Sequence, residues 1–399
     1  MDKNKRLTVW LPVIIAASIA LGIFIGNHYL SISQGKKRSY SSGNKINAIL
    51  DIIDEQYVDT VSMSKLVEST IPKIFSELDP HSVYIPAEDA SVVNEELEGS
   101  FSGIGVSFNM QTDTILVISV ISGGPAEKAG LLPFDRIISI NDSIFSGKKK
   151  NQGEIMKTLR GAKNSTVKLG VQRGNSPELL YFDVTRGDVP VNSVDVSYEA
   201  AKGIGYIKVS KFARNTYNEF ITAIAKLKQA GCTSFVIDLR GNTGGYMDAA
   251  INMINEFMPE GRLIVYTEGK SFPRSDVYAN GTGTCKDAPI VVLTDEISAS
   301  ASEIFSGAIQ DNDRGTIIGR RTYGKGLVQT QMSLSDGSEM RLTIARYYTP
   351  SGRCIQKKYE MGNTDAYDQD IYNRYMHGEF DSADRIKMDD SLKYQTVGG

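Results

Sequence analysis

The chain has 399 residues, 41% of them hydrophobic and 23% charged, with a formal net charge of −3. This composition is typical of a folded protein of roughly two or three domains and excludes a disordered chain. The charge provides no basic excess for non-specific nucleic-acid binding, so we expect no nucleic-acid partner. With only three histidines and three scattered cysteines, the chain has little material for a multi-histidine metal site, a disulfide framework or a zinc knuckle.

The N-terminus contains an unbroken apolar run from Leu7 to Gly26, preceded by basic residues. At about 1.5 Å per residue this run spans roughly 30 Å, the hydrocarbon thickness of a bilayer. A cleaved signal peptide is the alternative, but the run is long for one and shows no clear cleavage site. We favour a single-pass anchor in the cytoplasmic membrane over residues 1–30, with the remainder periplasmic or otherwise extracytoplasmic. A Gly/Ser/Lys-rich linker is expected over 31–44.

Residues 45–98 have apolar side chains at helical spacing, so we expect an N-terminal helical region. Leu78-Asp79-Pro80-His81-Ser82 interrupts that pattern.

Residues 99–187 change character and alternate in short strands. We expect strands at 115–118, 136–140 and 167–171, a helix over 152–159, and a turn with a short helix over 123–131. Together with the glycines that flank Ile104, this order resembles PDZ domains, which are α+β. The alternative is a glycine-rich hairpin without a ligand.

The PDZ resemblance implies a peptide-binding loop formed by Gly103, Ile104, Gly105 and Val106. In that family the loop points backbone N–H groups at a peptide's terminal carboxylate, while the peptide adds as a strand to the sheet edge. Phe134 departs from the family, which usually has glycine before the aspartate.

Residues 188–358 alternate strands with helices, which predicts an α/β domain with parallel pairing. The expected strands are 205–209, 235–239, 263–266, 290–293 and 316–318, the expected helices are 217–229, 248–257 and 301–310, and a terminal hairpin is expected over 327–334 and 340–346.

A glycine-rich loop, Asp238 to Gly245, follows one apolar strand. The carboxyl ends of parallel strands are where open α/β sheets bind ligands, and glycines let backbone N–H groups approach them. A plain strand-to-helix turn is the alternative, although it needs fewer glycines.

A serine-rich segment, Ser298 to Glu303, lies between another strand and a helix. Ser300 and Glu303 fit a helix capping box, which would explain both residues. A serine at a helix N-terminus is also suited to nucleophilic attack, because nearby N–H groups stabilise an oxyanion.

Lys325 lies between Gly324 and Gly326, directly before a predicted strand. A Ser-Lys pair is a known alternative to Ser-His-Asp and suits a region without histidine. Gly319, Gly324 and Lys325 also match a P-loop, but Gly326 replaces the Ser/Thr that would hold magnesium, and no helix follows.

These segments, in order over about residues 45–356, resemble the C-terminal processing peptidases, or tail-specific proteases. The resemblance implies a Ser-Lys serine endopeptidase with an α/β core of the crotonase and Clp-protease type, a parallel or mixed sheet with helices, into which the PDZ domain is inserted. It implies no metal or cofactor. Family members usually continue beyond the final glycines with further glycine-rich and strand segments.

By this resemblance Ser300 is the nucleophile, Lys325 the general base and Gln329 the residue that orients the lysine. On a strand, Lys325 and Gln329 would face the same side. The N–H of Ala301 would form half of an oxyanion hole, and that of Gly244, or of its neighbour, the other half.

The resemblance further implies that the PDZ domain binds protein or peptide substrates with apolar C-termini. Arg160 could bind the substrate carboxylate or dock the PDZ domain on the protease body, and a solvated arginine is the alternative. A PDZ adaptor with an inactive protease body is the rival function. A homo-oligomer is possible, and residues 359–399 read as a polar C-terminal tail.

Overall fold

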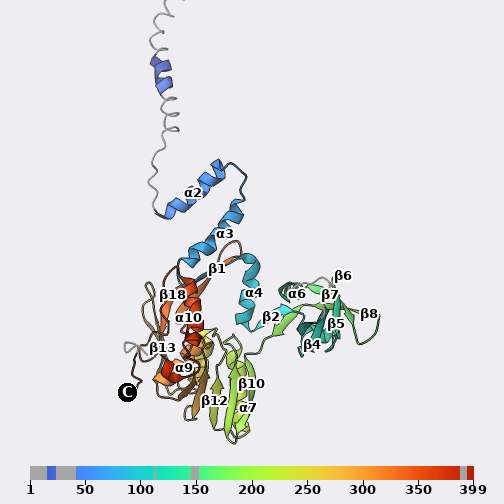
Figure 1. Ribbon diagram of the computed structural model, residues 1–399, viewed down its shortest axis with the longest axis vertical. Coiled ribbons are helices and arrows are strands. Elements are labelled where there is room, and N and C mark those ends of the chain that lie inside the picture. The colour runs from blue at the N-terminus through green and yellow to red at the C-terminus, as the bar shows by residue number, and fades with distance from the viewer. Residues whose placement is uncertain (1–15, 24–41, 112–113, 145–151, 387–392) are drawn as a thin grey trace, which may run out of the picture. The chain divides into compact units, whose positions relative to one another are not determined.

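The computed structural model describes residues 16–23, 42–111, 114–144, 152–386 and 393–399 (Figure 1). Compact packing divides the chain into one unit that ends at Thr70 and a second that begins at Ile71. Residues 16–23 are helical. In the described part of the chain no helix is long and apolar enough to cross a membrane. The rest of the predicted anchor, and the predicted linker up to residue 41, lie outside the described residues.

The predicted N-terminal helical region contains three helices. It also contains one short strand, which the apolar spacing did not predict. The elements are α2 (Ser42–Gln56), α3 (Met63–Ser76), β1 (Val83–Ile85) and α4 (Ala87–Glu98). Strand β1 follows the predicted break at residues 78–82 and pairs with a strand from the far end of the chain.

The PDZ region is a small antiparallel sheet with two short helices. Its elements are β3 (Val106–Gln111), β4 (Thr114–Val120), α5 (Pro125–Ala129), β5 (Arg136–Ile140), β6 (Ser143–Ile144), α6 (Gln152–Leu159), β7 (Thr166–Gln172) and β8 (Leu179–Thr185). The strand order is β3-β4-β5-β7-β8, which places β3 at an edge. Alternate strand residues enter a separate apolar core, as the predicted alternation requires. Strands β2 (Ser100–Gly103) and β9 (Gly187–Pro190) pair at the entry and exit of this region.

The α/β region is built on a five-stranded sheet of order β10-β11-β12-β15-β16. The strands are β10 (Val194–Ala201), β11 (Ile204–Val209), β12 (Ser234–Asp238), β15 (Ile290–Thr294) and β16 (Thr316–Gly319). The last four are parallel, as predicted, and β10 pairs antiparallel with β11. Helices α7 (Thr216–Gln229), α8 (Met247–Asn255) and α9 (Ala301–Asp311) supply buried side chains to the same core as the sheet.

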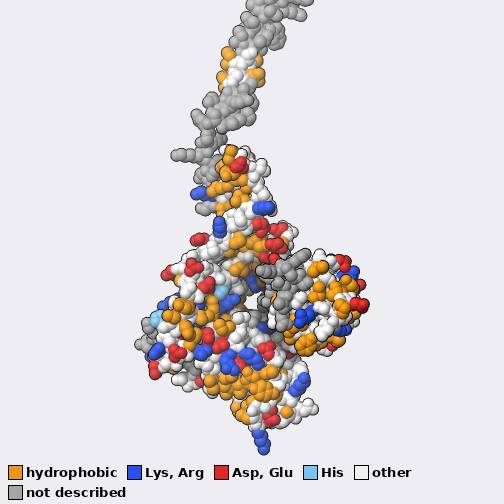
Figure 2. All heavy atoms as spheres, turned by 45° about the vertical axis from the view of Figure 1, so that its right-hand side comes forward, with side chains coloured by type: hydrophobic (Ala, Val, Ile, Leu, Met, Phe, Trp, Pro, Cys, Tyr) orange, Lys and Arg blue, Asp and Glu red, His pale blue; other side chains and the backbone are white. Residues whose placement is uncertain are grey.

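The two faces of this sheet differ in exposure. Phe235, Ile237 and Val292 belong to the core shared with the helices. On the opposite face, Tyr198 and Ile318 are exposed. Figure 2 shows hydrophobic side chains gathered next to Lys and Arg side chains on the surface of this region.

The prediction that residues 263–266 join the parallel sheet is wrong. They form β13 (Leu263–Glu268), which pairs antiparallel with β14 (Ser275–Tyr278) and β18 (Glu339–Tyr348). Strand β17 (Leu327–Ser333) and β18 form the predicted hairpin in this second sheet. An apolar strand carries the same pattern in either sheet, so periodicity alone could not assign its partners.

The predicted polar tail contains helix α10 (Thr364–Met376) and a short 3-10 helix, η1 (Ala383–Arg385). The helix has a weak apolar pattern because its buried residues are Tyr367 and Arg374 rather than aliphatic side chains. Segment 359–380 therefore contributes buried aromatic and polar contacts to the fold.

Candidate active site

Ser300 lies between the loop that follows β15 and the first residue of α9. Its backbone has φ of 55° and ψ of −112°. For a residue with a side chain this positive φ is strained, and such strain is common where a nucleophile is held on a sharp turn before a helix. Two serine hydroxyls bind this segment to the glycine-rich loop at 238–245. Ser298 Oγ donates to Leu239 O at 2.8 Å, and Ser302 Oγ donates to Asn242 O at 3.0 Å. Ser298 and Ser302, which flank Ser300, are thus structural.

The Glu303 carboxylate joins the serine loop to the lysine loop. One oxygen, Oε2, accepts the backbone N–H groups of Ser300 and Lys325, each at 2.8 Å. The other, Oε1, accepts Gly324 N–H at 2.6 Å and Thr322 Oγ1 at 2.7 Å. Burial raises the pKa of Glu303, and these donated bonds oppose the rise. The capping role of Glu303 is confirmed on the Ser300 side, but the same side chain also holds the lysine.

The Lys325 side chain is half-buried. Burial lowers the pKa of its ammonium, and the positive charge of Arg341 lowers it further, while Glu303 and Asp79 act in the opposite direction. A lowered pKa increases the neutral fraction of the amine, which a general base requires. No hydrogen bond joins Lys325 Nζ to Ser300 Oγ within the described residues, and such contacts often tighten only when substrate binds.

Lys325 is not on a strand, so the predicted strand phase with Gln329 does not apply. Strand β17 begins at Leu327, and its register with β18 shifts between Val328 and Gln329. Gln329 instead donates from Nε2 to His81 O. Burial lowers the pKa of the His81 imidazole to about 4, with the charge of Lys325 as the next cause. Gln329 therefore binds the backbone of His81, whose imidazole pKa is lowered by the charge of Lys325.

Asp79 fixes the segment that carries His81. Its Oδ1 accepts the N–H groups of His81 and Ser82, each at 3.0 Å, and the hydroxyl of Thr343 at 2.9 Å. Thr343 is the β18 partner of Gln329. The motif at residues 78–82, first noted as a break in a helical pattern, is thus attached to the strand pair beside the lysine.

Gly244 and Ala301 lie next to Ser300. A Cβ at Gly244 would lie 2.7 Å from Ser300 Cβ and 3.1 Å from Ala301 N, so only glycine fits there. No described group accepts the Ala301 N–H, which is one of the free donors of a helix start. The Gly244 N–H donates to Asn242 Oδ1 at 2.8 Å, whereas no described group accepts that of Gly245.

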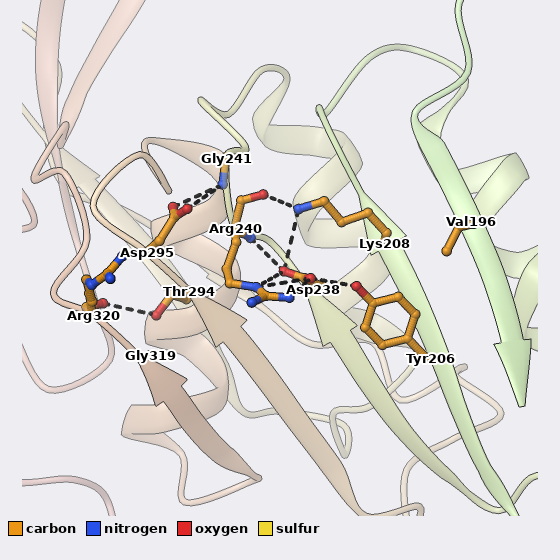
Figure 3. Close-up of a pocket in the computed structure, with 10 residues that line it drawn as sticks. All are labelled: Val196, Tyr206, Lys208, Asp238, Arg240, Gly241, Thr294, Asp295, Gly319 and Arg320. Carbon is orange, nitrogen blue, oxygen red and sulfur yellow. Dashed lines mark hydrogen bonds and ion pairs between the residues drawn. The ribbon is translucent and has the colours of Figure 1, made fainter. Parts of the chain in front are cut away.

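A cavity of about 780 Å³ lies at the carboxyl ends of β11, β12, β15 and β16 (Figure 3). Asp238 lines this cavity, is buried, and is bound by Arg240, Tyr206 and Lys208. Burial alone would raise the pKa of Asp238, but the bonds from Arg240 and Tyr206 bring it to about 2. Neither Ser300 nor Lys325 lines this cavity. Its residues hold the start of the glycine loop, because Lys208 donates to Arg240 O and Asp295 accepts the Gly241 N–H.

The predicted PDZ loop precedes the free edge of β3. Ile104 is buried in the PDZ core, and Gly105 has φ of 76°, a conformation that favours glycine. Phe134 keeps the glycine-like geometry of its turn, with φ of 70° and its ring exposed. An edge strand leaves backbone groups unpaired, as peptide addition requires.

Arg160 is not a solvated arginine. Its Nη1 lies 3.5 Å from Glu95 Oε2 on α4, and its guanidinium stacks 4.4 Å over the Phe101 ring on β2. These contacts join the PDZ region to α4 and β2, which lie outside the predicted protease core at 188–358.

The sequence missed the second role of Glu303, the place of His81 and the contribution of α10. The sequence showed only the spacing of Ser300 and Glu303, and a helix capping box fully explained that spacing. Among the described residues, no group of three His, Cys, Asp or Glu side chains could hold a metal ion.

Comparison with known proteins finds matches to both the α/β region and the PDZ region. Residues 203–365 match Peptidase family S41 and residues 102–195 match the PDZ domain. The carboxy-terminal processing protease CtpB of Bacillus subtilis is 35% identical over 79% of this chain, and the chain spans 66% of that protein's length. A probable CtpA-like serine protease of Staphylococcus aureus is 33% identical over 90% of this chain and 72% of its own length. The solved structure of the photosystem II D1 C-terminal processing protease is 28% identical and covers 79% of this chain and 91% of its own, with a TM-score of 0.45.

Proposed function

The chain belongs to peptidase family S41, the family of its C-terminal processing serine protease relatives, and we propose that Ser300 and Lys325 are its catalytic dyad. One observation carries the assignment: a single carboxylate oxygen of Glu303 binds the backbones of both residues. This contact brings a serine at a helix start and a partly buried lysine to one place, although 24 residues separate them in the chain.

In the proposed reaction, neutral Lys325 accepts the proton of Ser300 Oγ while that oxygen attacks the scissile carbonyl carbon. The carbonyl oxygen becomes an oxyanion. When the C–N bond breaks, the lysine ammonium gives its proton to the leaving amine, and an acyl-enzyme remains on Ser300. Lys325, neutral again, then takes a proton from water while the water oxygen attacks the acyl carbon. When the ester bond to Ser300 breaks, the lysine ammonium returns a proton to Ser300 Oγ, and the second product leaves as a carboxylic acid.

The proposed oxyanion hole uses the Ala301 N–H and one glycine N–H of the opposite loop. The Ala301 donor is free and lies at the positive end of α9. The glycine donor is that of Gly244 once it exchanges Asn242 Oδ1 for the oxyanion, or that of Gly245. Gln329 orients the lysine through the segment at His81.

The PDZ region, we propose, captures the C-terminus of the substrate. The edge position of β3 supports addition of a peptide strand, and Gly103, Ile104, Gly105 and Val106 at its start suit a carboxylate. Val106, Phe108 and Met110 on β3 pack partly on the apolar core, which favours apolar tails.

We also propose that the catalytic part acts outside the cytoplasm, attached to the cytoplasmic membrane through the N-terminal segment. The support is the apolar run from Leu7 to Gly26 after basic residues. The location is checked by adding a protease to intact and to lysed cells and comparing how much of the catalytic part is digested. A homo-oligomer stays a prediction.

The test of the catalytic assignment compares the full chain with Ser300→Ala and Lys325→Ala on an unfolded protein substrate with a free apolar C-terminus. Each variant is expected to lose at least about a thousandfold in kcat, as in other serine peptidases. Lys226→Ala, at an exposed position of α7, is the matched control and retains activity. Undiminished cleavage by both dyad variants would contradict the assignment, whereas tail binding without cleavage by the parent would favour the adaptor.

A further inference from the structure

The segment that carries Lys325 has no regular secondary structure. Residues 321–326 are neither helix nor strand. Such a segment has no ladder of its own to fix the direction of its side chains, so its precision depends on what binds its backbone polar groups. On the inner side Glu303 binds the N–H groups of Gly324 and Lys325.

On the other side, Arg374 of α10 binds the same segment through its carbonyl groups. Its Nη2 donates to Arg321 O at 2.6 Å and its Nη1 to Thr322 O at 3.1 Å. Its Nε donates to Glu379 Oε1 at 2.9 Å, and the same carboxylate accepts the Arg321 side chain. Arg374 is 5% exposed, so its charge is buried, and it is held by the paired carboxylate and the two carbonyls.

Tyr367 of α10 is 3% exposed, and its hydroxyl connects His81 with the backbone that follows Lys325. Its hydroxyl lies 2.9 Å from His81 Nε2 and accepts Gln356 Nε2 at 3.2 Å. Gln356 Oε1 in turn accepts the Gly326 N–H at 2.9 Å, directly after Lys325. The Tyr367 hydroxyl thus links Gly326, through Gln356, to His81. The backbone carbonyl of His81 is the group that accepts the Gln329 side chain.

Lys357 completes this side of the segment. Its backbone N–H donates to Gly324 O at 2.9 Å. Its ammonium lies 4.3 Å from the ring centre of Tyr323 and 4.0 Å from that of Tyr367, and it pairs with Asp370 of α10 at 3.1 Å. A β-carbon at Gly324 would lie 2.9 Å from Lys357 Cβ, so the two segments are in close contact.

We propose that α10 positions the catalytic lysine, with Arg374 and Tyr367 as positioning residues that clamp the loop against Glu303. The inference rests on the proposed dyad and adds a role to a segment whose sequence reads as a polar tail. A displacement of about 1 Å at a reacting group can cost about a hundredfold in rate. Because neither residue touches the scissile bond, the loss falls on the chemical step and leaves tail binding intact.

The test uses the full chain with Tyr367→Phe and Arg374→Lys. Tyr367→Phe removes only the hydroxyl, and Arg374→Lys keeps the charge but cannot bind two carbonyls and a carboxylate at once. Tyr372→Phe and Arg385→Lys, at exposed positions of the same C-terminal segment, are the matched controls. Pre-steady-state cleavage of an ester substrate separates the burst amplitude, which counts competent sites, from the rate of acylation.

Both variants are expected to lower the acylation rate about ten- to hundredfold, with KM and burst amplitude close to those of the parent. A merely structural role would lower the amplitude and leave the rate per site unchanged, and that result would overturn the inference. Unchanged acylation in both variants, with Ser300→Ala inactive, would also overturn it while the dyad stands. Full activity of Ser300→Ala would instead overturn the proposed dyad, and the positioning role with it.

Discussion

The catalytic loops and the PDZ region are both glycine-rich, but they use glycine for opposite purposes. Around Ser300 glycine allows two backbone segments to approach closely, since a Cβ at Gly244 would lie 2.7 Å from Ala299 O. At β3 the glycines lead into a strand that pairs with β4 on one side and with no described strand on the other. The comparison teaches that a reacting site needs its groups fixed in advance, whereas a tail-binding site needs unpaired groups at an edge.

Gly244→Ala is the largest expected break in the catalytic region. The new methyl group would collide with Ser300 Cβ and Ala299 O, both at 2.7 Å, and would close the proposed oxyanion hole. We expect kcat to fall at least about a hundredfold, with binding of a tail peptide unchanged. Gly241→Ala is the control, because Gly241 also has positive φ but has no atom within 4 Å of an added Cβ. Equal losses in both variants would mean that backbone strain, not the collision, is responsible.

Amidation of the substrate's C-terminus tests the other region. Loss of the terminal charge removes charge-assisted hydrogen bonds to the loop before β3, so we expect KM to rise about tenfold or more. The chemistry at Ser300 is untouched, and kcat should stay the same. Steady-state kinetics on a matched acid and amide pair measures both. An unchanged KM would remove the PDZ loop from substrate recognition.

Arg341→Gln tests the electrostatics of the lysine. The arginine charge lowers the pKa of Lys325, and its Nη2 is buried without a partner among the described groups. Without that charge the pKa of Lys325 rises, so less neutral base is present at a given pH. The acidic limb of the kcat profile should therefore move to higher pH. Arg346→Gln, on the same strand and exposed, should not move it. A shift to lower pH would contradict the assignment of Lys325 as base.

Phe134→Gly is the smallest expected effect and concerns stability alone. Phe134 has φ of 70°, which costs a residue with a side chain about 1–2 kcal/mol, and its exposed ring contributes little in return. After the extra chain entropy of glycine, the PDZ region should gain about 1 kcal/mol. Hydrogen exchange of the β5 amides in the full chain reports the local free energy of opening. Asn164→Gly, with φ of 67°, should gain less, because asparagine tolerates this conformation.

The sequence predicted the strands and helices of the α/β region well because apolar periodicity is local. It placed β13 in the wrong sheet, since pairing depends on distant strands such as β18. It also predicted a catalytic role for Ser300 and Lys325, which stays a prediction. The contacts that hold these two residues come from a buried carboxylate and from α10, whose buried residues are polar or aromatic. A polar side chain looks the same in a sequence whether it is solvated or buried in a network.

The most direct measurement is the mass of the full chain after rapid quenching with a slowly hydrolysed ester substrate. The account predicts one acyl group, on the peptide that contains Ser300, in the parent. It predicts none in Ser300→Ala and a strongly slowed appearance in Lys325→Ala. An acyl group on another residue, or turnover in the parent through no covalent intermediate at all, would contradict the dyad.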